Sequence, residues 1–376
     1  MKRAIVFVTA GALAVAVAST AACNKDNDAN GDGVDAAVPL LASRVARGHY
    51  LVDHVFVCSG CHSPRVLGMI DPARYLAGEE CMYGSPIVTA DGGSAGADAG
   101  DGGDARAPDA AARDGSAPDG SARDGSAPEA QVGCLNSRNL TNDATGLRNF
   151  TDAEIKDMIL IGVRPNGELL NPVMPYWEFH AMTDEDADAV VAYLRTVPGR
   201  DHRDKPSEAP WYPTSVAARP LDVAKVFAPL PTAPNYDALM RGRYLATLAC
   251  VGCHTPDAYP RGQRATAPLP IDESRLFAGN GVFAASLYHF PTFIFPPMIY
   301  GQNLTQDPTG LAGYQVDDIV KGLKLGKAKD GSNVCPPMPS GKEGFAGLTD
   351  DDAHDVAEYI LSLPGISNKR PEDCKL

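Results

Sequence analysis

Two short strings of cysteine and histidine have the residue types and the spacing to hold a cofactor covalently. They are Cys58-Ser59-Gly60-Cys61-His62 and Cys250-Val251-Gly252-Cys253-His254. Each reads Cys-x-x-Cys-His, the attachment pattern for a c-type haem. In that chemistry two thiols add across the vinyl groups of one haem, and the adjacent histidine reaches the iron as its proximal ligand. The sequence therefore predicts two covalently bound haem c groups, held by the four cysteines, with His62 and His254 on the irons.

A zinc site or a thioredoxin-like redox pair is the alternative interpretation of Cys-x-x-Cys. That interpretation has to explain why a histidine follows the second cysteine at the same place twice, at His62 and at His254. Haem attachment requires that histidine, whereas the alternatives do not, so we favour haem.

Two methionines are candidates for the sixth coordination position of the two irons. Met174 lies 35 residues after Asn139, Met338 lies 35 residues after Asn303, and a proline follows each methionine. A thioether is a soft ligand that suits haem iron and raises its potential. Packing in the core is the alternative role for a methionine. Three rivals for the distal position lack a counterpart in the other half of the chain: His180 for the first haem, and His289 and Met298 for the second.

The chain contains an internal repeat, which predicts two domains at residues 39–199 and 235–376. Three pairs of segments lie 164 residues apart: Asn139-Leu140-Thr141 with Asn303-Leu304-Thr305, Thr145-Gly146-Leu147 with Thr309-Gly310-Leu311, and Met174-Pro175 with Met338-Pro339. Thr183-Asp184 recurs 166 residues later as Thr349-Asp350. A duplicated domain in which one loop of the first copy is longer explains these offsets.

The pattern of apolar residues predicts an all-α fold of short helices in both domains. Thr151 and Glu154 form a capping-box signature before a helix over residues 155–161, and its partner covers residues 316–325. The last helix of each domain starts at Thr183 or Thr349 and then carries apolar residues at helical spacing. No strand pattern competes with these helices, so we expect none.

Taken together, these motifs resemble tandem class I cytochrome c domains. The resemblance rests on Cys-x-x-Cys-His, then Asn-Leu-Thr with Thr-Gly-Leu, then Met-Pro, then a final helix, and it covers roughly residues 39–199 and 235–365. The tandem resembles the cytochrome c subunits of periplasmic alcohol and sugar dehydrogenases. This resemblance implies a helical fold, His/Met-ligated haems and electron transfer. The chain departs from it in having two such domains where those subunits often have three.

The N-terminal residues 1–23 have the features of a bacterial export signal. Lys2 and Arg3 precede a short apolar run, and Thr20-Ala21-Ala22 then precedes Cys23, which resembles a lipobox. We expect Cys23 to be lipidated and to anchor the mature protein on the periplasmic side of a bacterial membrane. Ordinary signal cleavage nearby, with Cys23 removed or left free, is the alternative. Residues 24–38 would then form a flexible acidic tether, and no later segment is expected to span the bilayer.

Charge and composition restrict the partners and mark two non-domain segments. The formal net charge is −14 and there is no basic patch, so nucleic acid is not expected as a partner.

Residues 89–130 are of low complexity, which predicts a disordered insert in the first domain. Residues 200–234 are proline-rich and link the domains; we expect this linker to drape over both, because Trp211, Tyr212 and Phe227 require cover. The apolar and aromatic residues 283–300 either cover the second haem or dock a partner.

Four cysteines remain besides Cys23 and the haem cysteines, and an even remainder in an oxidising compartment suggests disulfides. We favour Cys81–Cys134 and Cys335–Cys374 because each pair stays within one domain. Each bridge would stabilise the fold by ~4 kcal/mol in the loop-entropy description. Free thiols are the alternative.

These observations predict an electron carrier whose partners are redox proteins such as a dehydrogenase, another cytochrome or an oxidase. The first alternative is the electron-accepting cytochrome subunit of a dehydrogenase complex. The second is a di-haem enzyme, either a peroxidase or a thiosulfate dehydrogenase. A peroxidase requires an iron open to substrate, which two methionines in matching positions argue against.

Overall fold

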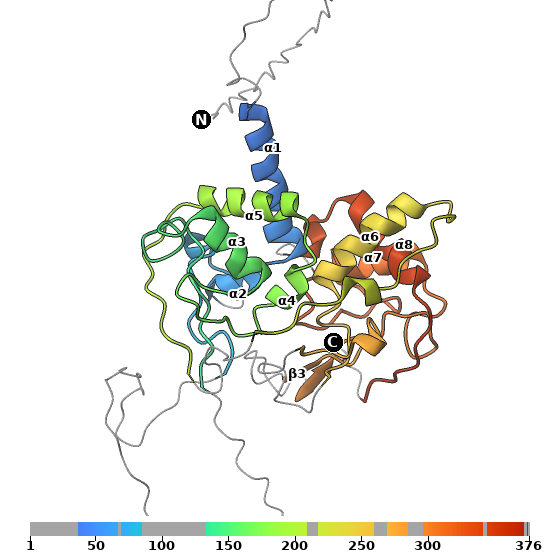
Figure 1. Cartoon of the computed structure of the whole chain (residues 1–376). Helices are drawn as coiled ribbons and strands as arrows, with labels where there is room; N and C mark the ends of the chain where they lie inside the picture. Colours follow the sequence, from blue (N-terminus) through green and yellow to red (C-terminus); the bar gives the residue numbers. More distant parts are fainter. Residues whose placement is uncertain are drawn as a thin grey trace, which may run out of the picture. The chain divides into compact units, whose positions relative to one another are not determined.

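The computed structural model describes residues 37–66, 69–84, 133–208, 217–258, 269–284, 296–340, 344–371 and 374 (Figure 1). The export signal with Cys23, most of the acidic tether and the tract 89–130 lie outside these residues. The chain divides into two units, Met1–Leu40 and Leu41–Leu376. The second unit contains both Cys-x-x-Cys-His strings, and the contacts below are within it. We call residues 41–208 its first half and residues 217–376 its second half.

Helices dominate the described secondary structure of both halves. The first half contains α1 (Ala37–Tyr50), which continues into a π-helical turn η1 (Leu51–Val55), α2 (Ser59–His62), α3 (Asp152–Leu160), α4 (Tyr176–Phe179) and α5 (Asp184–Thr196). The second half contains α6 (Tyr236–Ala249), α7 (Val316–Leu325) and α8 (Asp350–Ser362). Helix α7 has the predicted bounds, and α3 begins three residues earlier than predicted.

The expectation of no strands is wrong at four short segments. Strand β1 (Arg65–Val66) pairs with β2 (Met69–Ile70), and β3 (Val282–Ala284) pairs with β4 (Met298–Tyr300), both antiparallel. Strands of two or three residues are too short to leave a readable alternation of apolar and polar side chains. The second pair lies at the two ends of the aromatic segment 283–300, whose middle is outside the described residues.

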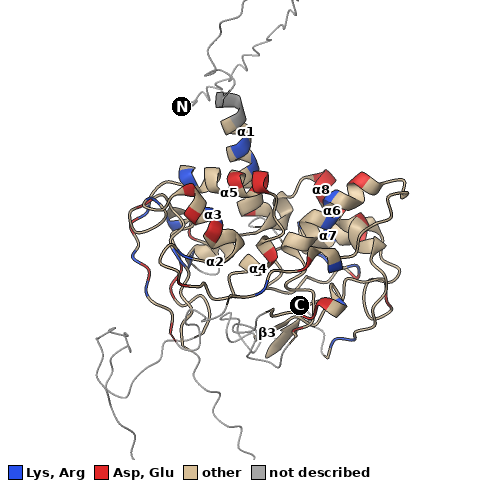
Figure 2. Ribbon diagram, in the orientation of Figure 1, with Lys and Arg blue, Asp and Glu red and all other residues tan. Residues whose placement is uncertain are grey.

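The helix starts follow the capping residues that the sequence offers. The predicted capping box is confirmed: the Thr151 hydroxyl accepts the Glu154 N–H, and the Glu154 carboxylate accepts the Thr151 N–H. The Thr183 and Thr349 hydroxyls cap α5 and α8 by accepting the N–H of Asp186 and of Asp352, and three acidic residues lie in the first turn of each helix (Figure 2). Negative charge at a helix N-terminus is favourable, so these sequences fix where the last helix of each half begins.

In each half the helix before the Cys-x-x-Cys-His string crosses the last helix at a glycine. A Cβ on Gly48 of α1 would overlap the Ala189 carbonyl of α5, and a Cβ on Gly242 of α6 would overlap the Asp355 carbonyl of α8. Glycine therefore allows the two helix backbones to come into contact. Figure 1 shows α6 and α8 side by side. The two crossings use equivalent places in the two halves.

We expect Gly242→Ala to destabilise the protein by about 1–3 kcal/mol, because the added methyl group has no room at the α6–α8 crossing. Chemical denaturation of the wild type and the variant measures this difference. Gly322→Ala is the matched control: Gly322 lies inside α7, and the nearest atom to an added Cβ would be 3.7 Å away. Alanine there should stabilise by about 0.5–1 kcal/mol. Equal effects of the two substitutions would contradict the crossing argument.

Two tyrosines join the halves in a reciprocal way. Tyr50, the last residue of α1, donates to Asp352 at 2.5 Å and accepts the N–H of Thr349, the cap of α8. Tyr244 of α6 donates to Asp186 at 2.8 Å and accepts the N–H of Thr183, the cap of α5. Burial and the carboxylate partner raise the pKa of both tyrosines to about 12. Each half therefore secures the helix start of the other.

The linker packs on both halves where it is described. In the first half, the Glu208 N–H donates to the Cys134 carbonyl at 2.8 Å, and Asp204 accepts the Asn139 N–H at 2.9 Å. Residues Ala218, Leu221 and Val226 are buried in the core. Trp211 and Tyr212 lie outside the described residues, and Phe227 is 36% exposed, so the linker does not cover Phe227 as expected.

Glu273 of the 3-10 turn η5 (Glu273–Arg275) holds the second part of the linker. Its side chain is 5% exposed and pairs with Arg219 at 2.8 Å and Lys225 at 2.7 Å, and it accepts the Asp222 N–H at 2.8 Å. Burial alone would raise the pKa of Glu273, but these three donors lower it to about 2. A depressed pKa means that the ionised form stabilises the fold.

We expect Glu273→Gln to cost on the order of 2 kcal/mol at neutral pH, allowing for the solvent exposure of the two cations. The contribution of Glu273 is fully present above its ordinary pKa of 4.5 and is lost as the pH falls towards about 2. The stability difference between wild type and variant should therefore shrink between these pH values in denaturant titrations. Asp201→Asn, at an exposed position of the same linker, is the control. A penalty independent of pH would contradict this assignment.

Candidate haem centres

The first Cys-x-x-Cys-His string begins three residues after the end of η1, and the second begins directly after α6. The first string forms the short helix α2 with Cys58 at its N-cap, and Val57 before it has a positive φ of 50°. The second string begins at Cys250, the C-terminal cap of α6. Cys250 is buried, Cys58 and Cys61 are half-buried, and Cys253 is exposed. The helix that ends at each string therefore positions the thiols.

The thiols of the strings do not have the properties of a redox-active pair. None of the four is in a disulfide, although the structure contains disulfides elsewhere. Burial raises the pKa of Cys58 to about 12, and it also raises the pKa of Cys61 and of Cys250. A thioredoxin-like cysteine needs a lowered pKa. Among the described residues no cluster of three or more His, Cys, Asp or Glu is placed to hold a metal ion.

Both string histidines are held through the same ring nitrogen. Nδ1 of His62 lies 2.8 Å from the Arg138 carbonyl, and Nδ1 of His254 lies 2.8 Å from the Gln302 carbonyl. A carbonyl accepts, so Nδ1 carries the proton and Nε2 keeps the lone pair that can bind iron. Burial lowers the pKa of both histidines, and the charge of Arg370 lowers that of His254 further. Both effects favour the neutral imidazole that metal ligation requires.

The Asn-Leu-Thr motif holds these two carbonyls in place. The asparagine after each carbonyl is buried, and its Oδ1 accepts both the N–H and the hydroxyl of the threonine two residues on, at 2.7–3.0 Å. Its Nδ2 donates to Thr145 and Arg200 in the first half and to Thr309 and Ile366 in the second. The repeat found in the sequence therefore fixes the backbone that orients each histidine.

A further repeated segment, which the sequence reasoning missed, closes the loop after each histidine. Ile-Asp-x-x-Arg-x-x-Ala-Gly occurs at residues 70–78 and again 201 residues later at 271–279. The buried Leu76 and Phe277 have positive φ, and their N–H groups donate to the hydroxyls of Ser63 and Thr255. The glycines that end the segments also have positive φ and donate to the carbonyls of His62 and His254 at 2.9 and 2.7 Å. The recurrence of this pattern at an offset of 201 residues is the sequence signal from which the segment could be found.

The two candidate methionines occupy equivalent tight turns. The Met174 N–H donates to the Asn171 carbonyl at 3.0 Å, and the Met338 N–H donates to the Cys335 carbonyl at 3.3 Å. The carbonyl of each methionine then accepts the N–H two residues on, at 2.8 Å. Both side chains are partly buried and pack against the hydrophobic core. Backbone turns of the same form therefore present a thioether in both halves.

The rival ligands have different surroundings. His180 is exposed at the end of α4, where its Nδ1 lies 3.2 Å from the Leu160 carbonyl. Met298 is part of β4, and His289 is outside the described residues. An exposed histidine is poorly placed for a buried haem iron, so Met174 stays the better candidate in the first half.

Two disulfides tie the candidate sites to the rest of the fold. Cys81 is bonded to Cys134, 53 residues away, and Cys335 is bonded to Cys374, 39 residues away. The first joins the described residues on either side of tract 89–130. The second fixes the C-terminal end of the chain to the turn that carries Met338. Each pairing stays within one half.

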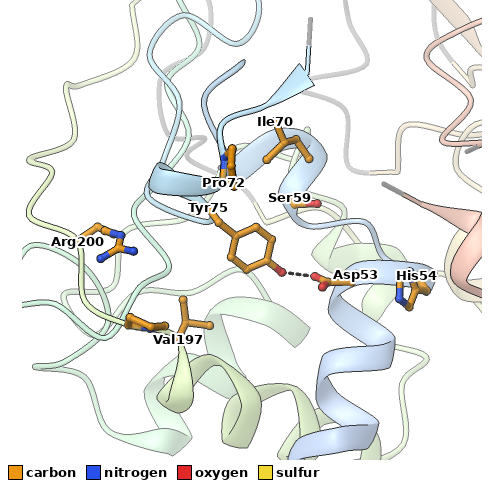
Figure 3. A pocket seen from close by; sticks show the side chains of 9 residues that line it. Asp53, His54, Ser59, Ile70, Pro72, Tyr75, Val197 and Arg200 are labelled. Carbon is orange, nitrogen blue, oxygen red and sulfur yellow. Dashed lines mark hydrogen bonds between the residues drawn. The ribbon is translucent and has the colours of Figure 1, made fainter. Parts of the chain in front are cut away.

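A cavity of about 600 Å³ lies beside the first string (Figure 3). Its lining includes Ser59 of the string, Asp53, Tyr75 and Arg200, and the Tyr75 hydroxyl donates to the Asp53 carboxylate. Burial and this hydrogen bond raise the pKa of Tyr75. The cavity borders the string at Ser59, and its lining residues do not include His62 or Met174.

Comparison with known proteins identifies the class of the second half. Residues 239–364 match the family model described as cytochrome c. They contain the second string, Asn303 and Met338, whose geometry is given above. The chain therefore contains a cytochrome c domain, a unit that binds haem covalently and transfers electrons.

Longer matches relate the chain to cytochrome subunits of dehydrogenases. It is 32% identical over 250 residues to the alcohol dehydrogenase (quinone) cytochrome c subunit of Komagataeibacter europaeus, covering 63% of this chain and 50% of that protein. It is 28% identical over 249 residues to the fructose dehydrogenase cytochrome subunit of Gluconobacter japonicus (62% and 45%). It is 29% identical over 243 residues to the gluconate 2-dehydrogenase cytochrome c subunit of Pantoea cypripedii (62% and 52%). The chain thus spans about half the length of these relatives.

The described residues fit a covalent haem in each half. Each string offers two thiols outside any disulfide and a histidine whose Nδ1 is already bonded. Each half also presents a partly buried thioether from an equivalent turn. No helix in the described part of the chain has the length and apolar character needed to cross a membrane.

Proposed function

We propose that this chain is an exported di-haem c-type cytochrome that serves as the electron-accepting subunit of a dehydrogenase. Each half carries one haem c: Cys58 and Cys61 bind the first haem and Cys250 and Cys253 the second. His62 and Met174 are the axial ligands of the first iron, and His254 and Met338 those of the second. A free electron carrier with the same haems is the second candidate.

The repeated hydrogen bond on the proximal histidine is the observation that carries the proposal. The cytochrome c match covers the second half alone, but the first half has the same bond to a carbonyl at 2.8 Å. It also has the same hydrogen bonds to a buried asparagine side chain and the same backbone turn at the methionine. A Cys-x-x-Cys string that served another purpose would not need this surrounding structure. The equivalence supports a second haem.

The residues of the chain prepare the site for rapid electron transfer. The haem supplies an iron that alternates between Fe(III) and Fe(II). Nδ1–H bonds orient the imidazoles, and the buried Asn139 and Asn303 keep the accepting carbonyls fixed. Rigid ligands change little between the two oxidation states, which keeps reorganisation small. The thioethers favour the reduced iron and so raise the potential.

The role as a subunit is supported by the kind of relatives that the chain matches. All three relatives named above are cytochrome subunits of dehydrogenases that act on an alcohol or a sugar-derived substrate. We therefore infer that a separate catalytic chain oxidises a small hydroxylated substrate and passes electrons to this one. The substrate itself is bound by that partner.

Export and anchoring are supported by the chemistry of the cysteines. The structure holds two disulfides, and such bonds persist in oxidising compartments such as the periplasm. The export-signal features of residues 1–23 are consistent with this location. We propose that Cys23 carries the lipid that keeps the protein at the membrane. A peroxidase or a thiosulfate dehydrogenase remains the alternative from another class.

We expect the purified protein to contain two haems per chain and two His/Met-ligated irons. Met174→Leu and Met338→Leu should each remove one thioether ligand, lower the potential of one haem and leave the haem count at two. Pyridine haemochrome analysis, mass spectrometry and redox titration measure these quantities. Met182→Leu is the control, because Met182 is buried in the core and is not a candidate ligand. A mass equal to the bare polypeptide would refute haem attachment.

We further expect a dehydrogenase to co-purify with the native protein and to reduce its haems when an alcohol, a hexose or gluconate is added. Reduction is followed by the change in the haem absorption bands after mild detergent extraction. The isolated chain serves as the control and should not respond to these substrates. Peroxide-dependent oxidation of a reduced donor by the isolated chain at enzymatic rates would instead favour the enzyme alternative.

A further inference from the structure

A carboxylate from the first half is buried against the haem string of the second half. Glu178 lies in α4, which starts two residues after Met174, and its side chain is buried at 5% exposure. Its Oε1 accepts the N–H of Gly252 at 3.0 Å, and Gly252 is the third residue of the second Cys-x-x-Cys-His string. The distal turn of one half thus contacts the attachment loop of the other.

The fit between Glu178 and Gly252 is close. A Cβ on Gly252 would lie 2.6 Å from Oε2 of Glu178 and 3.4 Å from the ring of Trp177. A side chain at position 252 would therefore have to displace the Glu178 carboxylate from the backbone of the string. The Trp177 ring is fixed in turn by its Nε1 bond to the Pro172 carbonyl at 3.1 Å.

The charge of Glu178 already acts on the groups of the second string. Burial raises the pKa of Cys250, and the negative charge of Glu178 adds to that increase. A charge that disfavours a thiolate also favours a more positive iron, because both effects are Coulombic and are strong at low dielectric. The oxidised iron has one more positive charge than the reduced iron. A nearby carboxylate therefore lowers the potential of the couple.

The first string has a different arrangement at the equivalent place. The N–H of Gly60 donates to the Val57 carbonyl of its own half at 2.9 Å. The turn after Met338 brings the Gly344 carbonyl to 3.2 Å from Nδ1 of His54, which precedes the string. The carboxylate bond from the opposite half is thus a property of the second string.

We propose that Glu178 is a positioning residue that sets the potential of the second haem below the value its His/Met ligands alone would give. This inference rests on the proposed di-haem function. Replacing the ionised carboxylate by an amide removes one negative charge beside the string.

The test is a redox titration of the full-length protein, with Glu178→Gln and Glu178→Asp. Met338→His identifies the second haem, because replacing the thioether by an imidazole lowers the potential of that haem alone. Glutamine can still accept the Gly252 N–H, so Glu178→Gln changes the charge and retains the hydrogen bond. Glu185→Gln, at an exposed position of α5, is the matched control.

We expect Glu178→Gln to raise the Fe(II)/Fe(III) ratio of the second haem about tenfold at fixed ambient potential, a shift of about 59 mV for one electron. The first haem and the Glu185→Gln variant should shift much less. Glu178→Asp keeps the charge and should restore most of the wild-type potential. Equal shifts of both haems, no shift, or Asp behaving like Gln would each overturn the inference. Haemochrome analysis separates the two proposals: fewer than two haems in the wild type overturns the di-haem function itself.

Discussion

The bond from Nδ1 of each string histidine to a backbone carbonyl is the interaction on which the rest of the structure depends. It leaves Nε2 as the ring nitrogen that is able to bind a metal, and it can form only if the segment ending at Arg138 or Gln302 stays against the string. The buried asparagine that follows each carbonyl supplies that rigidity through bonds to its own threonine and to the chain that leaves the last helix. Arg200 and Ile366, each more than 60 positions after the asparagine that they bond, thus take part in orienting the imidazoles.

The helix crossings supply the second constraint. The string follows α1 and η1 in one half and α6 in the other, so its position depends on where that helix lies against α5 or α8. Gly48 and Gly242 bring the backbones into contact, and the capping threonines fix the start of the last helices. Because the segment after α5 or α8 provides a carbonyl that the asparagine bonds, the crossing and the histidine bond reinforce each other.

Local signals allowed part of this to be predicted. The haem strings, the capping box at Thr151, helix α7 and the starts of α5 and α8 follow from spacing, capping chemistry and periodicity. The two strand pairs were missed because two or three residues carry no periodic signal. The hydrogen bond between Glu178 and Gly252 joins positions that are 74 residues apart in the sequence. The ion pairs of Glu273 with the linker join positions that are about 50 residues apart. Nothing in the local sequence of a glutamate distinguishes a buried partner from a solvated one, so such contacts need the fold.

The reciprocal contacts between the halves bear on how two haems would work together. Tyr50 bonds the start of α8 while Tyr244 bonds the start of α5, so a movement of one half against the other breaks part-buried hydrogen bonds between them. The linker adds a third attachment at Glu273. Two domains joined only by a mobile linker would sample many separations, and electron transfer between them would depend on chance encounters. Here Glu178 of the first half bonds the string of the second, so the folded chain holds the two strings together without relying on the linker alone.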